Sequence, residues 1–258
     1  MSEPLLHLAG LSMTFGGVRA IDNLDLAVDE GEIVAVIGPN GAGKTTVFNC
    51  VTGVFRPTAG SIYLAGRSIG GLRPHRITRA GVARTFQNIR LFANMTALEN
   101  TQVGADARHH TSVPGALVNA RRHRREEAEG RAEADRLLGF VGIAERAGER
   151  ASNLAYGDQR RLEIARAMAA RPRLLLLDEP AAGMNPAEKQ SLMALIRRIR
   201  DAGLTVVLIE HDMSLVMGIS DRVVVLNFGE KIADDTPAAV QQDPTVIAAY
   251  LGEPSDAA

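Results

Sequence analysis

Residues Gly38 to Thr45 read Gly-Pro-Asn-Gly-Ala-Gly-Lys-Thr, which matches the phosphate-binding pattern GxxxxGK[ST] without interruption. An apolar run, Ile33 to Ile37, comes directly before them and has the character of a strand. Glycines let backbone N–H groups approach phosphate oxygens, and a helix that starts here turns its positive dipole end toward the anion. Lys44 would add a positive charge near the β- and γ-phosphates, and Thr45 would offer a hydroxyl to Mg²⁺. The pattern predicts binding of a nucleoside triphosphate.

A second group of candidate residues follows the apolar run Leu174 to Leu177 and begins with Asp178 and Glu179. An acidic pair at the carboxyl end of a buried strand is costly unless a cation or water receives it, and in an open α/β sheet ligands bind at this edge. We therefore place the pair in the nucleotide site. Asp178 would hold Mg²⁺ through water, and Glu179 would polarise the attacking water as the general base.

A histidine follows another apolar run, Thr205 to Ile209, in the string Glu210-His211-Asp212. A lone histidine is more often structural than functional. Here its place at the end of the next strand puts His211 at the same edge as Glu179, where it could donate a hydrogen bond to the γ-phosphate. The position favours a functional role.

Short apolar runs between helical patterns indicate the fold class. Because they are continuous rather than alternating, they are typical of parallel strands buried on both faces. These runs are Ile33 to Ile37, Leu174 to Leu177, Thr205 to Ile209 and Arg222 to Leu226. More strongly alternating segments predict an antiparallel sheet beside this α/β core. They are Leu5 to Phe15, Leu24 to Val28 and Ser61 to Leu64.

Between about Leu91 and Ala151 the strand signal disappears and the sequence becomes helical, interrupted by His109 to Gly115. This predicts a helical subdomain inserted into the α/β core. It contains a dense charge run that starts with Arg121 to Arg125. The run could contact lipid headgroups or a partner, but cations and anions about one turn apart favour a solvated helix face.

The composition of the 258-residue chain is that of a soluble globular protein, with 46% hydrophobic and 23% charged residues. A net charge of -1 argues against nucleic acid as a partner. The single cysteine, Cys50, is expected to be a buried apolar group rather than a nucleophile. We expect a cytoplasmic chain, since no stretch is long and apolar enough to span a bilayer and the N-terminus lacks a signal peptide. A membrane role would come through a partner.

Two further strings complete a recognisable set of motifs. Gln87 ends the string Arg84-Thr85-Phe86-Gln87, and Leu154 to Arg161 reads Leu-Ala-Tyr-Gly-Asp-Gln-Arg-Arg. In order and spacing the motifs resemble the ATP-binding cassette of ABC transporters over essentially the whole chain. The resemblance implies an α/β P-loop NTPase (RecA-like) core with an antiparallel β subdomain and an inserted α-helical subdomain. Residues 1–90 would form the antiparallel β subdomain and the first part of the nucleotide-binding core. Residues 91–158 would form the helical subdomain, and residues 159–258 the second part of the core with a C-terminal helical extension.

The resemblance also implies roles for individual residues. Gln87 would couple the γ-phosphate and Mg²⁺ to the helical subdomain, Phe15 would stack on adenine, and Ala181 to Pro186 would form the D-loop. Glu179, His211 and Gln87 are the expected catalytic residues, and Thr45, Gln87 and Asp178 the expected Mg²⁺ residues. The expected ATP-binding residues are Phe15, Gly38, Pro39, Asn40, Gly41, Ala42, Gly43, Lys44, Thr45, Thr46 and Asp178, together with Ala155, Tyr156, Gly157 and Asp158.

Residues 154–158, called here the signature segment, depart from the family pattern LSGGQ. Ala155 replaces a serine, Tyr156 a glycine and Asp158 a glutamine, and the D-loop has Asn185 where many cassettes have aspartate. In the family this segment crosses a dimer interface and completes the partner's site. Loss of the serine contact to the γ-phosphate would cost about 1.5 to 3 kcal/mol. We expect weaker dimer closure, with backbone N–H groups near Gly157 still available.

The departures indicate a subfamily. Longer strings are similar to the ATPase subunit of branched-chain amino acid importers, and they are Leu154 to Arg166, Glu179 to Pro186, Ile209 to Met213 and Ala248 to Gly252. This resemblance implies transport of Leu, Ile or Val through separate permease subunits. It also implies a second cassette as partner, identical or paralogous, and indirectly a solute-binding protein. It implies a position at the cytoplasmic face of the membrane.

Parts of the sequence pattern are shared with proteins of other functions. Importers of urea or amides and ATPases for lipopolysaccharide export share parts of the pattern. A soluble ABC ATPase of translation or DNA repair would usually join two cassettes or carry a long coiled coil, whereas this chain has one phosphate loop and no sustained heptads. The presence of Glu179 and His211 argues against a nucleotide-binding regulator that does not hydrolyse. The sequence does not specify the transported solute.

Overall fold

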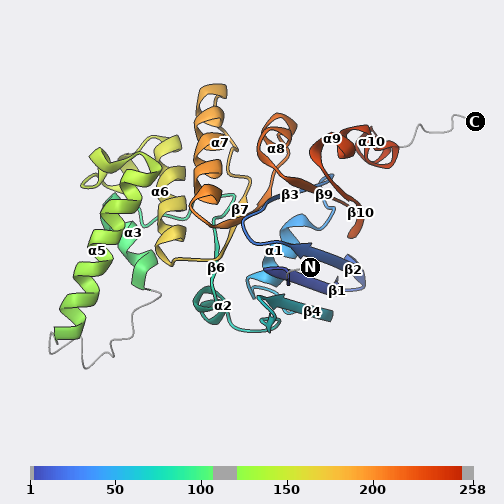
Figure 1. Ribbon diagram of the computed structural model, residues 1–258, viewed down its shortest axis with the longest axis horizontal. Coiled ribbons are helices and arrows are strands. Elements are labelled where there is room, and N and C mark those ends of the chain that lie inside the picture. Colours follow the sequence, from blue (N-terminus) through green and yellow to red (C-terminus); the bar gives the residue numbers. More distant parts are fainter. Residues whose placement is uncertain (1–2, 107–120, 252–258) are drawn as a thin grey trace, which may run out of the picture.

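The computed structural model describes residues 3–106 and 121–251 and contains two β-sheets with helices around them (Figure 1). The larger sheet has six strands in the order β10-β9-β3-β8-β7-β6, of which all but β10 run parallel. Its strands are β3 (Ile33–Ile37), β6 (Val82–Arg84), β7 (Leu174–Asp178), β8 (Thr205–Ile209), β9 (Arg222–Asn227) and β10 (Glu230–Asp235). The four apolar runs predicted as parallel strands are confirmed.

Strand β3 shows why these runs are apolar at every position. Ile33, Ala35 and Ile37 face a hydrophobic cluster on one side of the sheet. Val34 and Val36 face a separate cluster on the other side. Because successive side chains of a strand point to opposite faces, a strand covered on both faces must be apolar throughout.

The second sheet is antiparallel, as predicted, with strand order β2-β1-β4-β5. Its strands are β1 (Leu6–Phe15), β2 (Val18–Val28), β4 (Ala59–Leu64) and β5 (Arg67–Ser68). It shares a core with one face of the larger sheet and with helix α1 (Lys44–Val51), which buries Val47, Phe48 and Cys50. Cys50 is buried as expected, and burial raises the pKa of its thiol to about 11.

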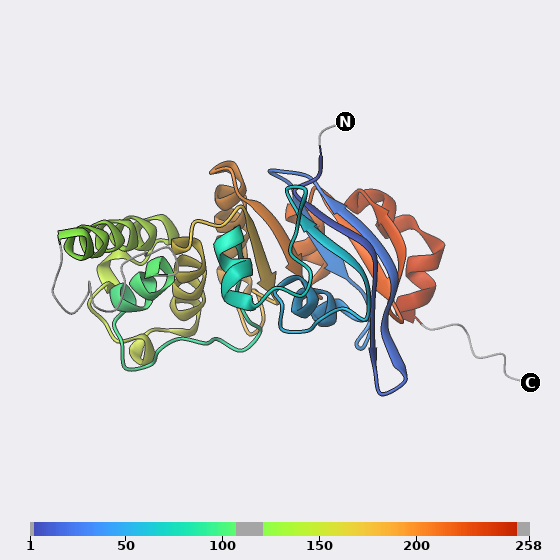
Figure 2. The same ribbon diagram turned by 90° about the horizontal axis from the view of Figure 1, so that it is seen from below.

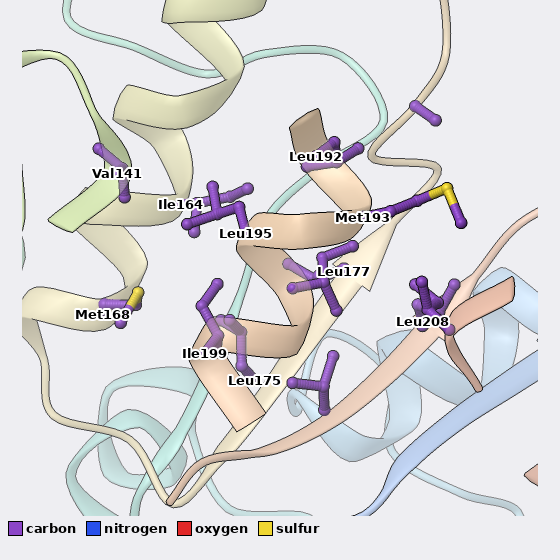
Figure 3. Packing of buried hydrophobic residues seen from close by; sticks show 14 of the residues in the cluster. Val141, Ile164, Met168, Leu175, Leu177, Leu192, Met193, Leu195, Ile199 and Leu208 are labelled. Carbon is purple, nitrogen blue, oxygen red and sulfur yellow. The ribbon is translucent and has the colours of Figure 1, made fainter. Parts of the chain in front are cut away.

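The opposite face of the larger sheet is covered by helices α6 (Tyr156–Ala169), α7 (Pro186–Asp201) and α8 (Met213–Ile219). Figure 3 shows how α7 connects two layers. Its Leu195 lies beside Ile164 of α6, and its Ile199 lies beside Leu175 of β7, all within one cluster. The hydrophobic core is therefore continuous from the sheet to the helical region.

The helical region predicted between Leu91 and Ala151 is confirmed for the residues that the structure describes. It contains α3 (Ala97–Asp106), α5 (Arg121–Val141) and two short 3₁₀ helices, Ala144–Arg146 and Ala151–Asn153. Helices α3, α5 and α6 pack on one another and form one end of the molecule (Figure 2). Residue 158, where the second predicted domain ends, lies inside α6. The division of the chain into domains stays a prediction.

The remaining helices are α2 (Pro74–Ala80), α9 (Pro237–Gln242) and α10 (Pro244–Leu251), and the last two form the opposite end of the molecule (Figure 1). Within the described ranges, no helix combines the length and the apolar character needed to cross a membrane. The side chains of the Arg121 to Arg125 charge run, the interruption at His109 to Gly115 and the tail Pro254 to Ala258 lie outside the described residues.

Candidate functional site

The phosphate loop connects the end of β3 to the start of α1, as predicted. Gly43 is the N-cap of α1 and has a left-handed φ of 99°. A Cβ atom at Gly43 would collide with the carbonyl oxygen of Ala20, and one at Gly38 with that of Leu226. These two positions therefore require glycine both for the backbone conformation and for the close approach of neighbouring backbone. The sequence pattern alone does not reveal these neighbours from β2 and β9.

Lys44 is held inside the loop. Its Nζ donates hydrogen bonds to the carbonyl oxygens of Gly38 at 2.6 Å and Pro39 at 2.9 Å. Burial lowers the pKa of Lys44, while the charges of Glu179 and Asp178 oppose that shift. The lysine of the loop therefore lies within electrostatic range of the acidic pair at the end of β7. The sequence analysis placed both in one nucleotide site.

Asp178 has a partner that the sequence analysis did not identify. Its Oδ2 accepts a hydrogen bond from Arg84 Nη2 at 2.7 Å, and the two side chains are 5% and 6% exposed. Arg84 also donates to Asn49 Oδ1 of α1 at 2.7 Å. Arg84 lies in the same string as Gln87, but only the contact geometry shows that its charge balances that of Asp178. The pair connects β6, β7 and α1.

Gln87, Glu179 and His211 come together, although they come from three different segments of the chain. Gln87 Nε2 donates to Glu179 Oε2 at 2.7 Å, and His211 Nδ1 lies 3.8 Å from the same oxygen. Glu179 has a positive φ of 45°, which is strained for a residue with a side chain and is often found at functional sites. The arrangement can bind and orient a water molecule next to a carboxylate; the three catalytic roles stay predictions.

Glu210 is a second buried residue that the sequence analysis did not identify as part of the site. Its side chain is 1% exposed, and burial raises its pKa. It accepts hydrogen bonds from the backbone N–H groups of Ala181 at 2.8 Å, His211 at 3.1 Å and Asp212 at 3.4 Å. Glu210 therefore connects the D-loop to the segment that carries His211. Asp212, in turn, caps α8 and pairs with Lys189.

Phe15 lies at the end of β1 and is 40% exposed. Its ring meets the edge of Phe55, with centroids 5.1 Å apart and an angle of 73° between the planes. An aromatic side chain that is partly exposed and supported from one side can provide a surface for a base. Stacking of adenine on Phe15 stays a prediction.

The signature segment leads into helix α6. Ala155 is the N-cap of this helix and provides no side-chain cap, whereas a serine would. Tyr156 lies against Gly183 of the D-loop, where an added Cβ would meet its ring at 3.4 Å. Asp158 pairs with Arg161 at 3.7 Å, which offsets its negative charge. Among the described hydrogen bonds and ion pairs, none joins residues 155–158 to the phosphate loop of the same chain.

Asn185, the other departure from the family pattern, has a local structural explanation. It is the N-cap of α7, and its side chain accepts from the N–H groups of Ala187 and Glu188 at 3.0 Å each. The N–H of Asn185 in turn donates to Glu188 Oε2 at 2.9 Å, which completes a capping box. Asparagine is among the strongest N-cap residues, so this substitution preserves the helix start.

The predicted Mg²⁺ residues provide the right type of donor. Among the described residues, no group of three or more His, Cys, Asp and Glu side chains could hold a metal ion. Thr45, Gln87 and Asp178 instead offer one hydroxyl, one amide and one carboxylate. These hard oxygen donors fit Mg²⁺, which usually binds through one or two carboxylates plus phosphates and water.

Comparison with known proteins identifies the family. The ABC transporter family model matches residues 21–182. The chain belongs to the ABC transporter family. A second model, the branched-chain amino acid ATP-binding cassette transporter, matches residues 230–256.

Relatives cover this ABC protein over nearly its full length. The high-affinity branched-chain amino acid transport ATP-binding protein BraF of Pseudomonas aeruginosa is 52% identical over 98% of the chain and 100% of its own length. LivG of Escherichia coli, which has the same descriptive name, is 50% identical with the same coverage. Family members are ATPases that bind ATP or ADP and work in transporter complexes, and this chain is an ATPase of that kind.

Solved cassettes confirm the predicted fold. An ATP-binding cassette of an ABC transporter in its ADP conformation has a TM-score of 0.85 at 28% identity, covering 98% of this chain and 100% of that one. A nucleotide-free cassette has a TM-score of 0.84 at 28% identity, covering 96% and 99%. This chain therefore has the α/β cassette fold that the resemblance implied.

The buried Arg84–Asp178 pair yields a prediction about stability. We expect Arg84→Ala to lower the free energy of unfolding by about 3 to 5 kcal/mol, because removal of one partner leaves a buried carboxylate without its cation. Arg173→Ala is the matched control, since Arg173 pairs with Glu30 at 3.0 Å on the surface. It should cost less than about 1 kcal/mol. Denaturant unfolding at pH 7 measures both, and equal losses would contradict the assigned importance of the buried pair.

Proposed function

We propose that this chain is the ATP-hydrolysing subunit of an importer of branched-chain amino acids, and that it powers uptake of Leu, Ile or Val through separate permease subunits. The observation that carries the ATPase assignment is the contact of Gln87 and His211 with Glu179 beside the phosphate loop. The names of relatives about half identical over the whole chain support the cargo, as does the match of residues 230–256 to the branched-chain amino acid model.

The residues of the site suggest a division of labour. The phosphate loop, residues 38–46, would hold the phosphates, and Lys44 would exchange its two carbonyl acceptors for phosphate oxygens. Glu179 would accept a proton from the attacking water, while Gln87 orients that water and His211 donates a hydrogen bond to the γ-phosphate. Mg²⁺, when bound through Thr45, Gln87 and Asp178, would neutralise charge on the β- and γ-phosphates.

The arrangement of the signature segment favours a site shared between two cassettes. Residues 155–158 lie at the start of α6, where backbone N–H groups can meet the nucleotide bound by a partner. The partner would be an identical or paralogous cassette, and membrane permease subunits would hold the two side by side. A solute-binding protein would deliver the cargo from the other side of the membrane, and this chain would lie at the cytoplasmic face.

Transport in a defined system tests the assignment of cargo. We expect vesicles that contain the assembled transporter, with ATP on the cassette side, to take up labelled Leu, Ile and Val when the solute-binding protein is present. Vesicles with the Lys44→Ala chain are the control and should take up none of them. Uptake of urea or an amide in place of the three amino acids would contradict the proposed cargo but leave the ATPase assignment intact.

Substitution of the proposed base tests the chemical step. Glu179→Gln retains the size and a hydrogen-bond acceptor but cannot accept the proton, so we expect kcat to fall by about 10² to 10⁴-fold with ATP affinity largely kept. Dimers with trapped ATP should accumulate. Glu30→Gln, which changes an exposed carboxylate paired with Arg173, is the control. Hydrolysis at a near-normal rate by Glu179→Gln in the assembled complex would remove Glu179 from the role of base.

The signature segment yields a prediction about assembly. We expect the isolated chain to be a slow ATPase, because Ala155 and Asp158 would weaken the closure of one cassette over the nucleotide of a second copy. We expect permease subunits to increase the rate, because they raise the effective concentration of cassettes. Ala155→Ser should raise the rate of the isolated chain. The serine also supplies the missing cap of α6, worth about 0.5 to 2 kcal/mol, so thermal unfolding is measured as well.

The dependence on protein concentration distinguishes closure from mere stabilisation of the helix. If Ala155→Ser strengthens closure, its rate should reach half-maximum at a lower protein concentration than that of the wild type. A wild-type rate that is fast and independent of concentration without partners would show that dimer closure does not limit this enzyme.

A further inference from the structure

Helix α6 contains an ion pair that is completely buried. Arg160 and Glu163, one turn apart on this helix, have side chains that are 0% and 1% exposed, and Arg160 Nη1 donates to Glu163 Oε2 at 2.8 Å. Burial raises the pKa of Glu163, and the nearby positive charge of Arg160 opposes that rise. Neither residue belongs to the nucleotide-binding set proposed above, so the pair needs its own explanation.

Both members of the pair bind the backbone of residues 86–90, called here the Gln87 loop. Arg160 donates to the carbonyl oxygen of Phe86 at 2.7 Å and to that of Gln87 at 2.9 Å. Glu163 Oε1 accepts from the N–H groups of Phe86 and Arg90, at 3.3 Å each. The guanidinium of Arg160 and the carboxylate of Glu163 thus each make hydrogen bonds both to the other member of the pair and to the loop.

The pair also connects the loop to the start of the helix. Arg160 Nη2 lies 3.3 Å from the hydroxyl of Tyr156 in the signature segment. At the other end of this connection, the side chain of Gln87 donates to Glu179 at 2.7 Å. A chain of contacts therefore runs from the signature segment through Arg160 to the Gln87 backbone and on to Glu179.

Energy alone does not explain a buried charge pair at this place. Desolvation of two charges can exceed their attraction, and apolar residues of similar volume are often as stabilising or more so. Arg160 also leaves its Nε without a hydrogen-bond acceptor among the described atoms. An apolar pair could pack α6 against its neighbours, but it could not hold two carbonyl and two N–H groups of a loop in fixed positions.

We propose that Arg160 and Glu163 are positioning residues that make the Gln87 loop follow helix α6, so that Gln87 is in place for hydrolysis only when the signature segment is. This inference rests on the proposed roles of Gln87 and Glu179. Displacement of α6 relative to the sheet would pull Gln87 away from Glu179. The state of the surface that meets the partner cassette would thereby control the chemical site within the same chain.

The central experiment removes both charges of the pair at the same time; Arg166, a second cation that faces Glu163, is kept. In Arg160→Met combined with Glu163→Leu, apolar side chains fill the space, so we expect a thermal unfolding temperature close to that of the wild type. In the assembled complex kcat should fall at least about 10-fold, while the KM for ATP changes less than about 3-fold, because the phosphate loop is untouched. The control is Arg146→Gln with Glu149→Gln, an exposed pair of the same spacing, which should change neither.

A double-mutant cycle with Gln87 tests whether the pair acts through that residue. In a Gln87→Ala background, removal of the pair should lower kcat by less than about 2-fold, since the group that it positions is already gone. A further 10-fold loss in that background would overturn the proposal. A large fall in unfolding temperature in the apolar double variant would overturn it as well, because the pair would then be chiefly structural.

Hydrogen exchange gives a readout that does not depend on hydrolysis. The N–H groups of Phe86 and Arg90 should exchange faster in the apolar double variant, with exchange in α5 unchanged; equal protection of the loop would overturn the proposal whatever the ATPase rate. Failure of the proposed function would be seen differently, as an assembled wild-type complex that does not hydrolyse ATP although the loop is protected.

Discussion

The burial of carboxylates at the ends of two neighbouring parallel strands is the constraint on which the rest of the site depends. Asp178 ends β7 and Glu210 follows β8, and both are almost completely buried. Each requires compensation: Asp178 receives Arg84, and Glu210 receives three backbone N–H groups. These compensating groups come from β6, from the D-loop and from the segment of His211. Satisfaction of the buried charges therefore also determines where these segments lie.

The departures from the family signature are accompanied by local replacements. Tyr156 occupies a glycine position, yet its ring lies against Gly183 and its hydroxyl meets Arg160. Asp158 is paired with Arg161, and Asn185 completes a capping box at the start of α7. Ala155 is the exception, because among the described residues no other side chain caps helix α6 in place of the serine hydroxyl. The segment has thus gained contacts within its own chain and lost a polar group on the surface that would face a partner cassette.

Local patterns account for what could be predicted from the sequence. The apolar runs predicted β3, β7, β8 and β9 because burial on both faces requires continuous hydrophobicity, and the place of His211 after the next strand predicted that it would share an edge with Glu179. The charge balance within the site could not be predicted. Arg84 and Asp178 are 94 residues apart, and Arg160 is 73 residues from Gln87. No periodicity or spacing indicates which distant cation neutralises which carboxylate.

The distribution of polar groups separates the source of stability from the source of precision. Two extensive apolar clusters, one on each face of the six-stranded sheet, provide the burial that holds the fold together. The buried ion pairs and the strained backbone at Glu179 contribute little to that burial or oppose it. They persist because hydrogen bonds have direction, whereas apolar contacts do not. A site in which a glutamine, a glutamate and a histidine from three segments meet needs that direction, and the large core supplies the free energy that it costs.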